Sequence, residues 1–339
     1  MKHIFSVTSN LTFAICNKIV EVENIHPEDC ILFLVRDYQI PEEYNSIYTD
    51  QIPTSYNVAV DKGRVFAGAN VFKTKRNIQD FDRLVDAHIK NEDYVWYSSV
   101  CSNDLCSLMV TKKNCKGYYV FEDGGASYRD FNPQTFTGIR YWIYKIFLNP
   151  FCHRIFAVKN HFITNDHPKF KGCYATNERC FPLHQQYLKV IGSPFKKKEY
   201  DFHPDAVLSI DPLFLFVDNA TADKVYAKLA AFIKAKNYKC LAIKYHPRFN
   251  AQSNIEFKKI YADFISKYFG DNIFEIESGI ILEELLETYK CDFYTANSSI
   301  AIYGATSGST CYTYIPLLEP YTNAFDSEKL IKELCVAVR

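Results

Sequence analysis

Residues 3–35 read HIFSVTSNLTFAICNKIVEVENIHPEDCILFLV, and their pattern of apolar and polar residues indicates the fold class. The apolar segment 3–7 predicts a strand, and the apolar spacing of 11–20 predicts a helix after it. The apolar run 30–35 predicts a second strand. A strand, a helix and a strand in this order are typical of the start of a parallel sheet.

The rest of the chain continues this alternation. In the first half we expect a polar helix over 77–90 and strands over 93–99 and 118–121. In the second half the expected strands are 213–217, 240–245, 273–276, 291–295 and 310–315, and the expected helices are 221–236, 255–268, 281–289, 298–303 and 327–336. We therefore predict an α/β protein with doubly wound parallel sheets, which bind ligands at the carboxyl ends of their strands.

The length of 339 residues corresponds to roughly two domains, at about 150 residues each. The regular alternation stops between about 165 and 205, where prolines, glycines and Lys196-Lys197-Lys198 gather. We expect an N-terminal Rossmann-like domain over 1–165, an interdomain connection over 166–205 and a C-terminal Rossmann-like domain over 206–339. Two such domains that face each other leave a central cleft.

The composition excludes several classes of protein. Lys+Arg and Asp+Glu number 39 each, so the chain has no global positive field to collect nucleic acid. Its apolar runs are far shorter than the ~20 residues that span a bilayer. Polar residues 8–10 interrupt the first apolar stretch, which argues against a signal peptide. We therefore expect a cytoplasmic protein.

Cysteines and acidic pairs give little support for a metal site. The 12 cysteines include no Cys-x-x-Cys pair, and many lie in apolar, strand-like runs, so we expect reduced, buried thiols. The one apparent Asp-x-Asp, Asp80-Phe81-Asp82, lies at the start of a predicted polar helix, where acids favour the first turn. No G-x-G-x-x-G and no P-loop motif is present, so dinucleotide redox and P-loop chemistry lose support.

A first short motif, Glu122-Asp123-Gly124-Gly125, directly follows the predicted strand 118–121. An acidic pair at the carboxyl end of a strand puts a carboxylate over the binding edge, and the glycines let a ligand approach the backbone. A general base could stand here. Taken alone, the residues favour an ordinary Asp-Gly turn.

A second motif, Lys244-Tyr245-His246-Pro247-Arg248, ends another predicted strand. The proline biases His246 toward an extended conformation, which can aim its ring at the binding edge. There an imidazolium could donate a proton or a hydrogen bond to a leaving phosphate, helped by the charges of Lys244 and Arg248. The alternative is a loop-forming proline beside a surface histidine.

A third motif, Thr295-Ala296-Asn297-Ser298-Ser299, runs from a predicted strand into a predicted helix. Asn297 or Ser298 can cap that helix, and its free N–H groups and the serine hydroxyls suit a phosphate. An ordinary N-cap is the alternative. The joint placement of a base, an acid and a phosphate site after three strands strengthens all three functional interpretations.

These motifs, in this order, resemble the signature of bacterial sialyltransferases, which include lipooligosaccharide sialyltransferases, polysialyltransferases and multifunctional marine-type enzymes. The opening turn Thr8-Ser9-Asn10 is similar too. The resemblance implies a GT-B fold, with an N-terminal acceptor-binding domain and a C-terminal domain that binds the CMP-sugar donor. It also implies a CMP-sialic acid donor, a glycan acceptor, inversion at the anomeric carbon, and no metal or other cofactor.

The resemblance also assigns roles to residues. Glu122 looks like the base, within the Glu122-Asp123-Gly124 motif, and His246 like the acid that stabilises the departing phosphate. Ser298 and Ser299 look like phosphate ligands, and Glu283 looks like the ribose-binding glutamate, with Glu284 as the alternative. The predicted site residues are Glu122 and His246 for catalysis; Ser298, Ser299, Glu283, Lys244 and Asn297 for the donor; and Asp123, Gly124 and Asn10 for the acceptor or other contacts.

The predicted enzyme therefore transfers sialic acid to a lipooligosaccharide or capsule glycan. The alternatives are a related glycosyltransferase that uses CMP-Kdo or a UDP-hexose, and a glycan- or nucleotide-binding protein without turnover. The basic, aromatic stretch 140–148 leaves open core packing, a homodimer contact or peripheral contact with the inner membrane. Lys196-Lys197-Lys198 fits a solvated linker or a patch that steers anions.

Overall fold

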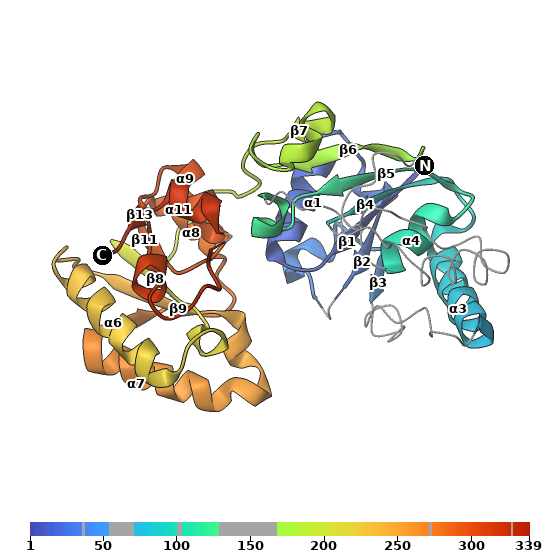
Figure 1. Ribbon diagram of the computed structural model, residues 1–339. Coiled ribbons are helices and arrows are strands. Elements are labelled where there is room, and N and C mark those ends of the chain that lie inside the picture. The colour runs from blue at the N-terminus through green and yellow to red at the C-terminus, as the bar shows by residue number, and fades with distance from the viewer. Residues whose placement is uncertain (36–37, 54–70, 100–103, 129–167, 271–272, 327) are drawn as a thin grey trace. The chain divides into compact units, whose positions relative to one another are not determined.

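The computed structural model describes residues 1–35, 38–53, 71–99, 104–128, 168–270, 273–326 and 328–339. The chain divides into two compact units, Met1–Pro194 and Phe195–Arg339, and each contains one parallel sheet with its helices (Figure 1). The prediction of an α/β protein with two Rossmann-like domains is confirmed.

The sheet of the first unit has the strand order β3-β2-β1-β4-β5-β6-β7, and neighbouring strands are parallel. Its strands are β1 Lys2–Val7, β2 Cys30–Leu34, β3 Gln51–Pro53, β4 Tyr94–Ser98, β5 Cys115–Phe121, β6 Phe170–Ala175 and β7 Leu188–Val190. Its α-helices are α1 Asn10–Val22, α3 Val71–Ile89 and α4 Asp104–Thr111, and its 3-10 turns are η1 Pro27–Asp29, η2 Glu42–Tyr44, η4 Gly124–Tyr128 and η6 Pro182–Tyr187.

The opening unit forms as predicted, and its helix start has a local cause. Ser9 caps α1 through a capping box, in which Ser9 Oγ accepts from Thr12 N at 3.3 Å and Thr12 Oγ1 accepts from Ser9 N at 2.9 Å. Apolar residues of α1 such as Phe13 and Ile19 pack against alternate residues of the neighbouring strands, including Phe5. This packing buries one face of the sheet, so β1 is fixed in register beside β2 and β4.

The sheet of the second unit has the order β10-β9-β8-β11-β12-β13, again with parallel neighbours. Its strands are β8 Ala206–Ile210, β9 Leu241–Tyr245, β10 Phe274–Glu275, β11 Asp292–Thr295, β12 Cys311–Thr313 and β13 Val336–Ala337. Its α-helices are α6 Asn219–Lys234, α7 Ile255–Phe269, α8 Leu282–Tyr289, α9 Ile300–Ser307, α10 Ile315–Leu318 and α11 Lys329–Leu334, and its 3-10 turns are η7 Leu213–Leu215, η8 Pro247–Asn250 and η9 Gln252–Asn254.

The strand order of the second unit locates its binding edge. When β8 is counted as the first strand, the strand order is 3-2-1-4-5-6, which is that of a doubly wound dinucleotide-binding sheet. In such a sheet the first three strands are added toward one side and the next three toward the other, so the strand order reverses between the first and the fourth strand. That reversal lies between β8 and β11. Helices α6 and α7 lie together on one face of the sheet, and α8, α9 and α11 lie together on the other (Figure 1).

The first strand of this sheet differs from the prediction. The strand is β8, Ala206–Ile210, and all five of its residues are buried. The expected strand 213–217 begins instead as the 3-10 turn η7, after Pro212. Proline lacks the N–H that a central strand donates to its neighbour, so the chain leaves the sheet before Pro212.

The boundary between the compact units falls at Pro194 and Phe195, inside the predicted connection 166–205. However, β6 and β7 also lie inside 166–205 and complete the first sheet. Both strands contain a lysine, β6 also contains a glycine, and β7 has only three residues, so neither has the continuous apolar run that identifies a buried strand. The connection therefore begins later than predicted.

Two further predictions concern acidic and cysteine residues. The motif Asp80-Phe81-Asp82 lies in the middle of α3, not at a helix start, because α3 begins at Val71. Its Phe81 is fully buried, while Asp80 pairs with Arg83 at 2.6 Å and Asp82 with Lys112 at 3.3 Å. The ten cysteines of the described ranges are all free, and nine of them are buried. None of the helices described is long and apolar enough to cross a membrane.

Candidate active site

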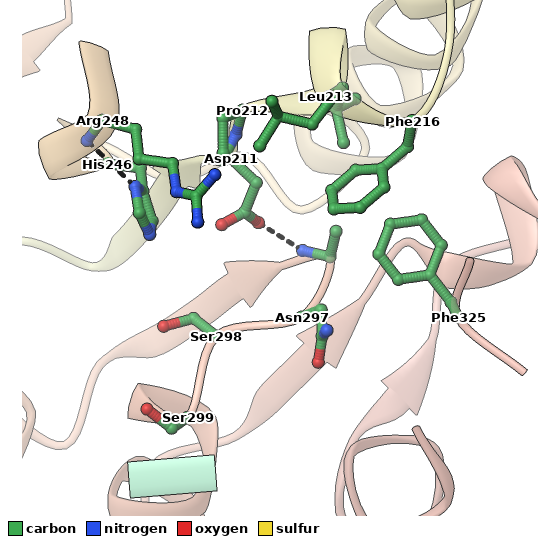
Figure 2. A pocket seen from close by; sticks show the side chains of 12 residues that line it. Asp211, Pro212, Leu213, Phe216, His246, Arg248, Asn297, Ser298, Ser299 and Phe325 are labelled. Atoms are coloured by element: carbon green, nitrogen blue, oxygen red, sulfur yellow. Dashed lines mark hydrogen bonds between the residues drawn. The ribbon is translucent and has the colours of Figure 1, made fainter. Parts of the chain in front are cut away.

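A pocket of about 520 Å³ lies at the carboxyl edge of the second sheet, at the reversal between β8 and β11 (Figure 2). Doubly wound sheets bind their ligands at this position. The residues that line it are Asp211, Pro212, Leu213, Leu215, Phe216, His246, Arg248, Ala296, Asn297, Ser298, Ser299 and Phe325. Four of the residues predicted to bind the donor or act in catalysis, His246, Asn297, Ser298 and Ser299, are thus brought together.

His246 follows β9 and is held by backbone contacts on both sides. Its N–H donates to Ile210 O at 3.1 Å, and its Nδ1 accepts from Arg248 N at 3.1 Å (Figure 2). An Nδ1 that accepts is unprotonated, so the ring hydrogen is on Nε2. Burial lowers the pKa of His246, Asp211 acts to raise it, and Arg248 acts to lower it further. With Nδ1 accepting in this way, the neutral form of the ring donates through Nε2–H.

The serine turn, Thr295 to Ser299, connects β11 to α9 as predicted. Ser298 N donates to Thr295 Oγ1 at 3.0 Å, and Ser298 Oγ accepts from Ile300 N at 3.3 Å. Ser299 caps α9 without a side-chain hydrogen bond to the helix, which leaves its hydroxyl able to turn to a ligand. Two hydroxyls and the N-terminus of an eight-residue helix are therefore gathered at one edge of the pocket, where an anion is favoured.

Asp211, which the sequence analysis did not identify, follows β8 at the centre of the pocket. It is only 6% exposed, and its Oδ2 accepts from Ala296 N at 2.6 Å, Thr295 Oγ1 at 2.8 Å and Tyr314 Oη at 2.9 Å. The sequence contains a signal for it, an acid followed by proline after the apolar run 206–210. That signal was missed because the strand was expected at 213–217.

Lys244 and Glu283 are not among the residues that line the pocket. Lys244 Nζ donates to the carbonyls of Glu277 at 3.1 Å, Ser278 at 3.3 Å and Ile280. Burial lowers the pKa of Lys244 and raises that of Glu283, and each group opposes the shift of the other. Glu284 instead accepts from Tyr200 Oη at 3.4 Å. Glu283 thus lies in the field of Lys244 at the end of β9, while Glu284 contacts the segment that begins the second unit.

Glu122 lies in the first unit, directly after β5, and is fully buried. Its Oε1 accepts from Tyr128 Oη at 2.6 Å, and its Oε2 accepts from Thr176 N and Thr176 Oγ1, both at 2.8 Å. Burial, and then Glu122, raise the pKa of Tyr128, so its hydroxyl remains a donor. The carboxylate therefore joins the ends of β5 and β6 and is enclosed.

The neighbours of Glu122 are placed differently. Asp123 is partly exposed, and its N–H donates to Ser127 Oγ at 2.9 Å. Gly124 has φ +66°, a left-handed conformation that glycine adopts easily and that starts η4. Asn10, in the first turn of α1, accepts from Tyr38 Oη at 2.8 Å through its Oδ1.

The other predicted features are not among the described residues that line the pocket. Lys196-Lys197-Lys198 is exposed at the start of the second unit, where Lys198 N donates to Thr288 Oγ1 at 3.0 Å. The stretch 140–148 lies outside the described residues, so its contact with a membrane, a second copy or the core stays a prediction. Within the described ranges, no group of three or more His, Cys, Asp or Glu residues could hold a metal ion.

The model of the alpha-2,8-polysialyltransferase (POLYST) family matches residues 14–313, which is most of the chain. The chain belongs to the alpha-2,8-polysialyltransferase family. This polysialyltransferase-family chain is therefore a glycosyltransferase, for which a nucleotide-sugar donor and a glycan acceptor are fitting substrates. The match confirms the resemblance to bacterial sialyltransferases. No curated protein sequence matches the chain.

Solved structures support the fold of this polysialyltransferase-family chain. UDP-GlcNAc 2-epimerase from Methanocaldococcus jannaschii is similar with a TM-score of 0.53 and 12% identity, over 100% of this chain and 89% of that chain. The S. aureus MnaA-UDP co-structure is similar with a TM-score of 0.51 and 9% identity, over 92% of this chain and 79% of that chain. At such low identity the likeness shows the fold alone, and that fold is GT-B, as predicted.

Proposed function

We propose that the chain transfers sialic acid from CMP-sialic acid to a hydroxyl of a surface glycan, with inversion at the anomeric carbon and without a metal ion. The family's description suggests a sialic acid end as the acceptor and an α2,8 bond as the product. We propose that the acceptor belongs to a lipooligosaccharide or a capsule glycan. The observation that carries the proposal is the pocket at the β8–β11 reversal, where His246, Ser298 and Ser299 meet. Its volume of about 520 Å³ lies in the range of small-ligand sites, about 300–1,000 Å³.

The phosphate of CMP fits the polar edge of this pocket. His246 Nε2–H, the hydroxyls of Ser298 and Ser299, and the N-terminus of α9 all favour negative charge there. CMP carries a single phosphate, so the charge that develops as it leaves is small enough for these donors to stabilise. Apolar residues, including Leu213 and Phe216, line the same pocket beside them.

The reaction we propose is a direct displacement. The oxygen of the acceptor hydroxyl attacks the anomeric carbon, and the bond from that carbon to the phosphate oxygen breaks with both electrons going to the oxygen. The hydroxyl proton passes to the base, and protonated His246 gives a proton to the departing phosphate. The binding of a phosphate anion favours the protonated ring, which counteracts the effect of burial.

We propose Glu122 as the base. Because its carboxylate is enclosed, an acceptor proton would reach it through the hydroxyl of Tyr128 or Thr176, each of which contacts it directly. Asp123 is the second candidate, since it is partly exposed and lies next to Glu122. The chemistry is the same with either acid.

The test is incubation of the enzyme with CMP-sialic acid and sialoside- or lactose-terminated acceptors, with the products measured by mass spectrometry. We expect transfer by the wild type, loss of about 10²–10⁴-fold in His246→Ala, and a similar loss in Glu122→Gln or in Asp123→Asn, whichever removes the base. CMP at 100 times its Kd should stabilise the protein by about 2.7 kcal/mol, and UDP should do so much less.

The same assay separates the alternatives. Transfer that persists in Glu122→Gln, Asp123→Asn and His246→Ala would contradict the assigned roles. Stabilisation by UDP in place of CMP would indicate a UDP-hexose donor, and turnover of CMP-Kdo alone would indicate that sugar. Binding of CMP-sialic acid without release of CMP for any acceptor would indicate a binding protein.

A further inference from the structure

Asp211 occupies a position that two predicted motifs share. It follows β8, which lies between β9 and β11 in the sheet, so it stands between the strand that ends at His246 and the strand that ends at the serine turn. In Figure 2 the side chains of Arg248 and His246 lie on one side of the Asp211 carboxylate, and a dashed line on its other side marks the hydrogen bond from Ala296 N. No other carboxylate is among the described residues that line the pocket.

The hydrogen bonds of Asp211 connect it firmly to the serine turn. Three donors converge on Oδ2, namely Thr295 Oγ1, Ala296 N and Tyr314 Oη, and Ser209 Oγ donates to Oδ1 at 3.3 Å. A buried carboxylate destabilises the fold unless such donors compensate for the lost contact with water. The four donors therefore hold the Asp211 carboxylate in this one position. The bond to Ala296 N fixes the backbone where β11 ends and the turn toward Ser298 begins.

On its other side the carboxylate has His246 and Arg248 as neighbours in the pocket (Figure 2). Asp211 from β8 and Arg248 from η8 are the two charged groups that act on the ring, and they act in opposite directions. Arg248 is exposed, whereas Asp211 is buried and so less screened by water. A buried negative charge beside an imidazole favours its protonated form.

We propose that Asp211 is a positioning residue, which holds the serine turn through Oδ2 and favours the protonated ring of His246 through its charge. The inference rests on the proposed function. Holding the serine turn serves the binding of the CMP phosphate, and favouring the protonated ring of His246 serves the protonation of that phosphate. Asp211 itself touches neither the acceptor hydroxyl nor the anomeric carbon in this scheme.

Two substitutions separate the two tasks. Asp211→Asn keeps an oxygen that can accept from Ala296 N but removes the charge, and Asp211→Glu keeps the charge but moves the carboxylate away from Ala296. The titration midpoint of His246 is measured on the full chain by NMR with ¹³C-labelled histidine, and its signal is assigned by its loss in His246→Ala. CMP affinity is measured by calorimetry.

In Asp211→Asn we expect the midpoint of His246 to fall by about one pH unit, while CMP binds no more weakly when affinity is measured at a pH below both midpoints, where the ring is protonated in both proteins. In Asp211→Glu we expect the midpoint to stay near that of the wild type and CMP affinity to fall about tenfold, as the turn loses its anchor. Tyr314→Phe is the matched control, because it removes one donor to Oδ2 and leaves the charge in place. It should leave the midpoint unchanged.

An unchanged midpoint in Asp211→Asn, or an equal shift in Tyr314→Phe, overturns the electrostatic task. Unchanged CMP affinity in Asp211→Glu overturns the anchoring task. If Asp211→Asn does not fold, Asp211→Glu still tests the proposal. A His246 midpoint that falls by about one pH unit together with CMP affinity in Asp211→Glu would overturn it, because the two tasks would then not separate. Absence of sialic acid transfer by the wild type would refute the proposed function alone, because the midpoints are measured without turnover.

Discussion

His246 shows most clearly how burial and chemistry interact at a single residue. Burial lowers its pKa below the ordinary 6.5, so as the pH falls through about 6.5 the unfolded chain takes up a proton before the folded one does. The contribution of the neutral His246 ring to stability is therefore fully present above pH 6.5 and is lost as the pH falls. The proposed reaction needs the protonated ring instead, and we propose that the bound phosphate anion raises the pKa of His246 enough to favour that state.

The first prediction follows from this sign. His246→Asn removes the titrating group and keeps an oxygen that can accept from Arg248 N, so the variant should lose less stability than the wild type between pH 7.5 and pH 5. Urea unfolding at both pH values measures this. His3 and His184, whose pKa values burial also lowers, remain in both proteins and provide the common background. An equal loss in both proteins would show that His246 does not contribute.

The serine turn depends on how closely α9 packs. A methyl group at Gly304 would lie 3.0 Å from both Cys311 Sγ and Leu286 Cδ1, so α9 can approach β12 and α8 only because residue 304 lacks a side chain. This close approach sets the position of the N-terminus of α9, and therefore of Ser299.

We accordingly predict that Gly304→Ala destabilises the protein. Overpacking costs about 1–3 kcal/mol, and the better helix propensity of alanine offsets about 1 kcal/mol of it. CMP affinity should fall too, because α9 must shift. Gly279→Ala is the control, since a methyl group there meets nothing within 4 Å, and its stability should change by no more than about 0.5 kcal/mol. Thermal unfolding and calorimetry measure both, and an equal effect of the two substitutions would contradict the packing argument.

The elements differ in how well the sequence predicted them, and the difference is physical. Continuous apolar runs and helical spacing identify buried elements. They predicted the first strand-helix-strand segment, β1, α1 and β2, and also α6, α7 and β9, to within a few residues. β6 and β7 were missed because lysine interrupts both, and glycine also interrupts β6, so neither has a continuous apolar run. β7 is in addition a three-residue edge strand. The placement of β8 was wrong because the apolar run 213–217 begins as a 3-10 turn after Pro212 and does not pair in the sheet.

The site follows the same logic. His246 and the serine turn were predicted because proline and serine mark the ends of well-predicted strands. Asp211 was missed along with its strand, and the burial of Glu122 depends on Thr176, which is 54 residues away in the chain and belongs to the missed strand region. Contacts between distant segments carry no local pattern, so sequence periodicity alone does not reveal them.

At the scale of the whole molecule, each unit has its own sheet, and the pocket residues belong to the second unit alone. We therefore predict that Glu122→Gln lowers the free energy of unfolding by about 1–3 kcal/mol, because an amide NH₂ would face the donors of Thr176 or Tyr128, yet leaves CMP affinity unchanged. Glu178→Gln, on an exposed side chain two residues beyond Thr176, is the control. Weaker CMP binding in Glu122→Gln would show that the units do not act separately in donor binding.

The free thiols have a practical consequence for the whole molecule. Six of the ten described cysteines lie in the first unit and four in the second, and only Cys240 is partly exposed. A buried thiol reacts with an alkylating reagent only after its surroundings open, so the labelling rate of each cysteine under native conditions reports a local opening free energy. Peptide mapping of alkylated protein can thus compare how often the surroundings of each cysteine open in the two units, without any substitution in the chain.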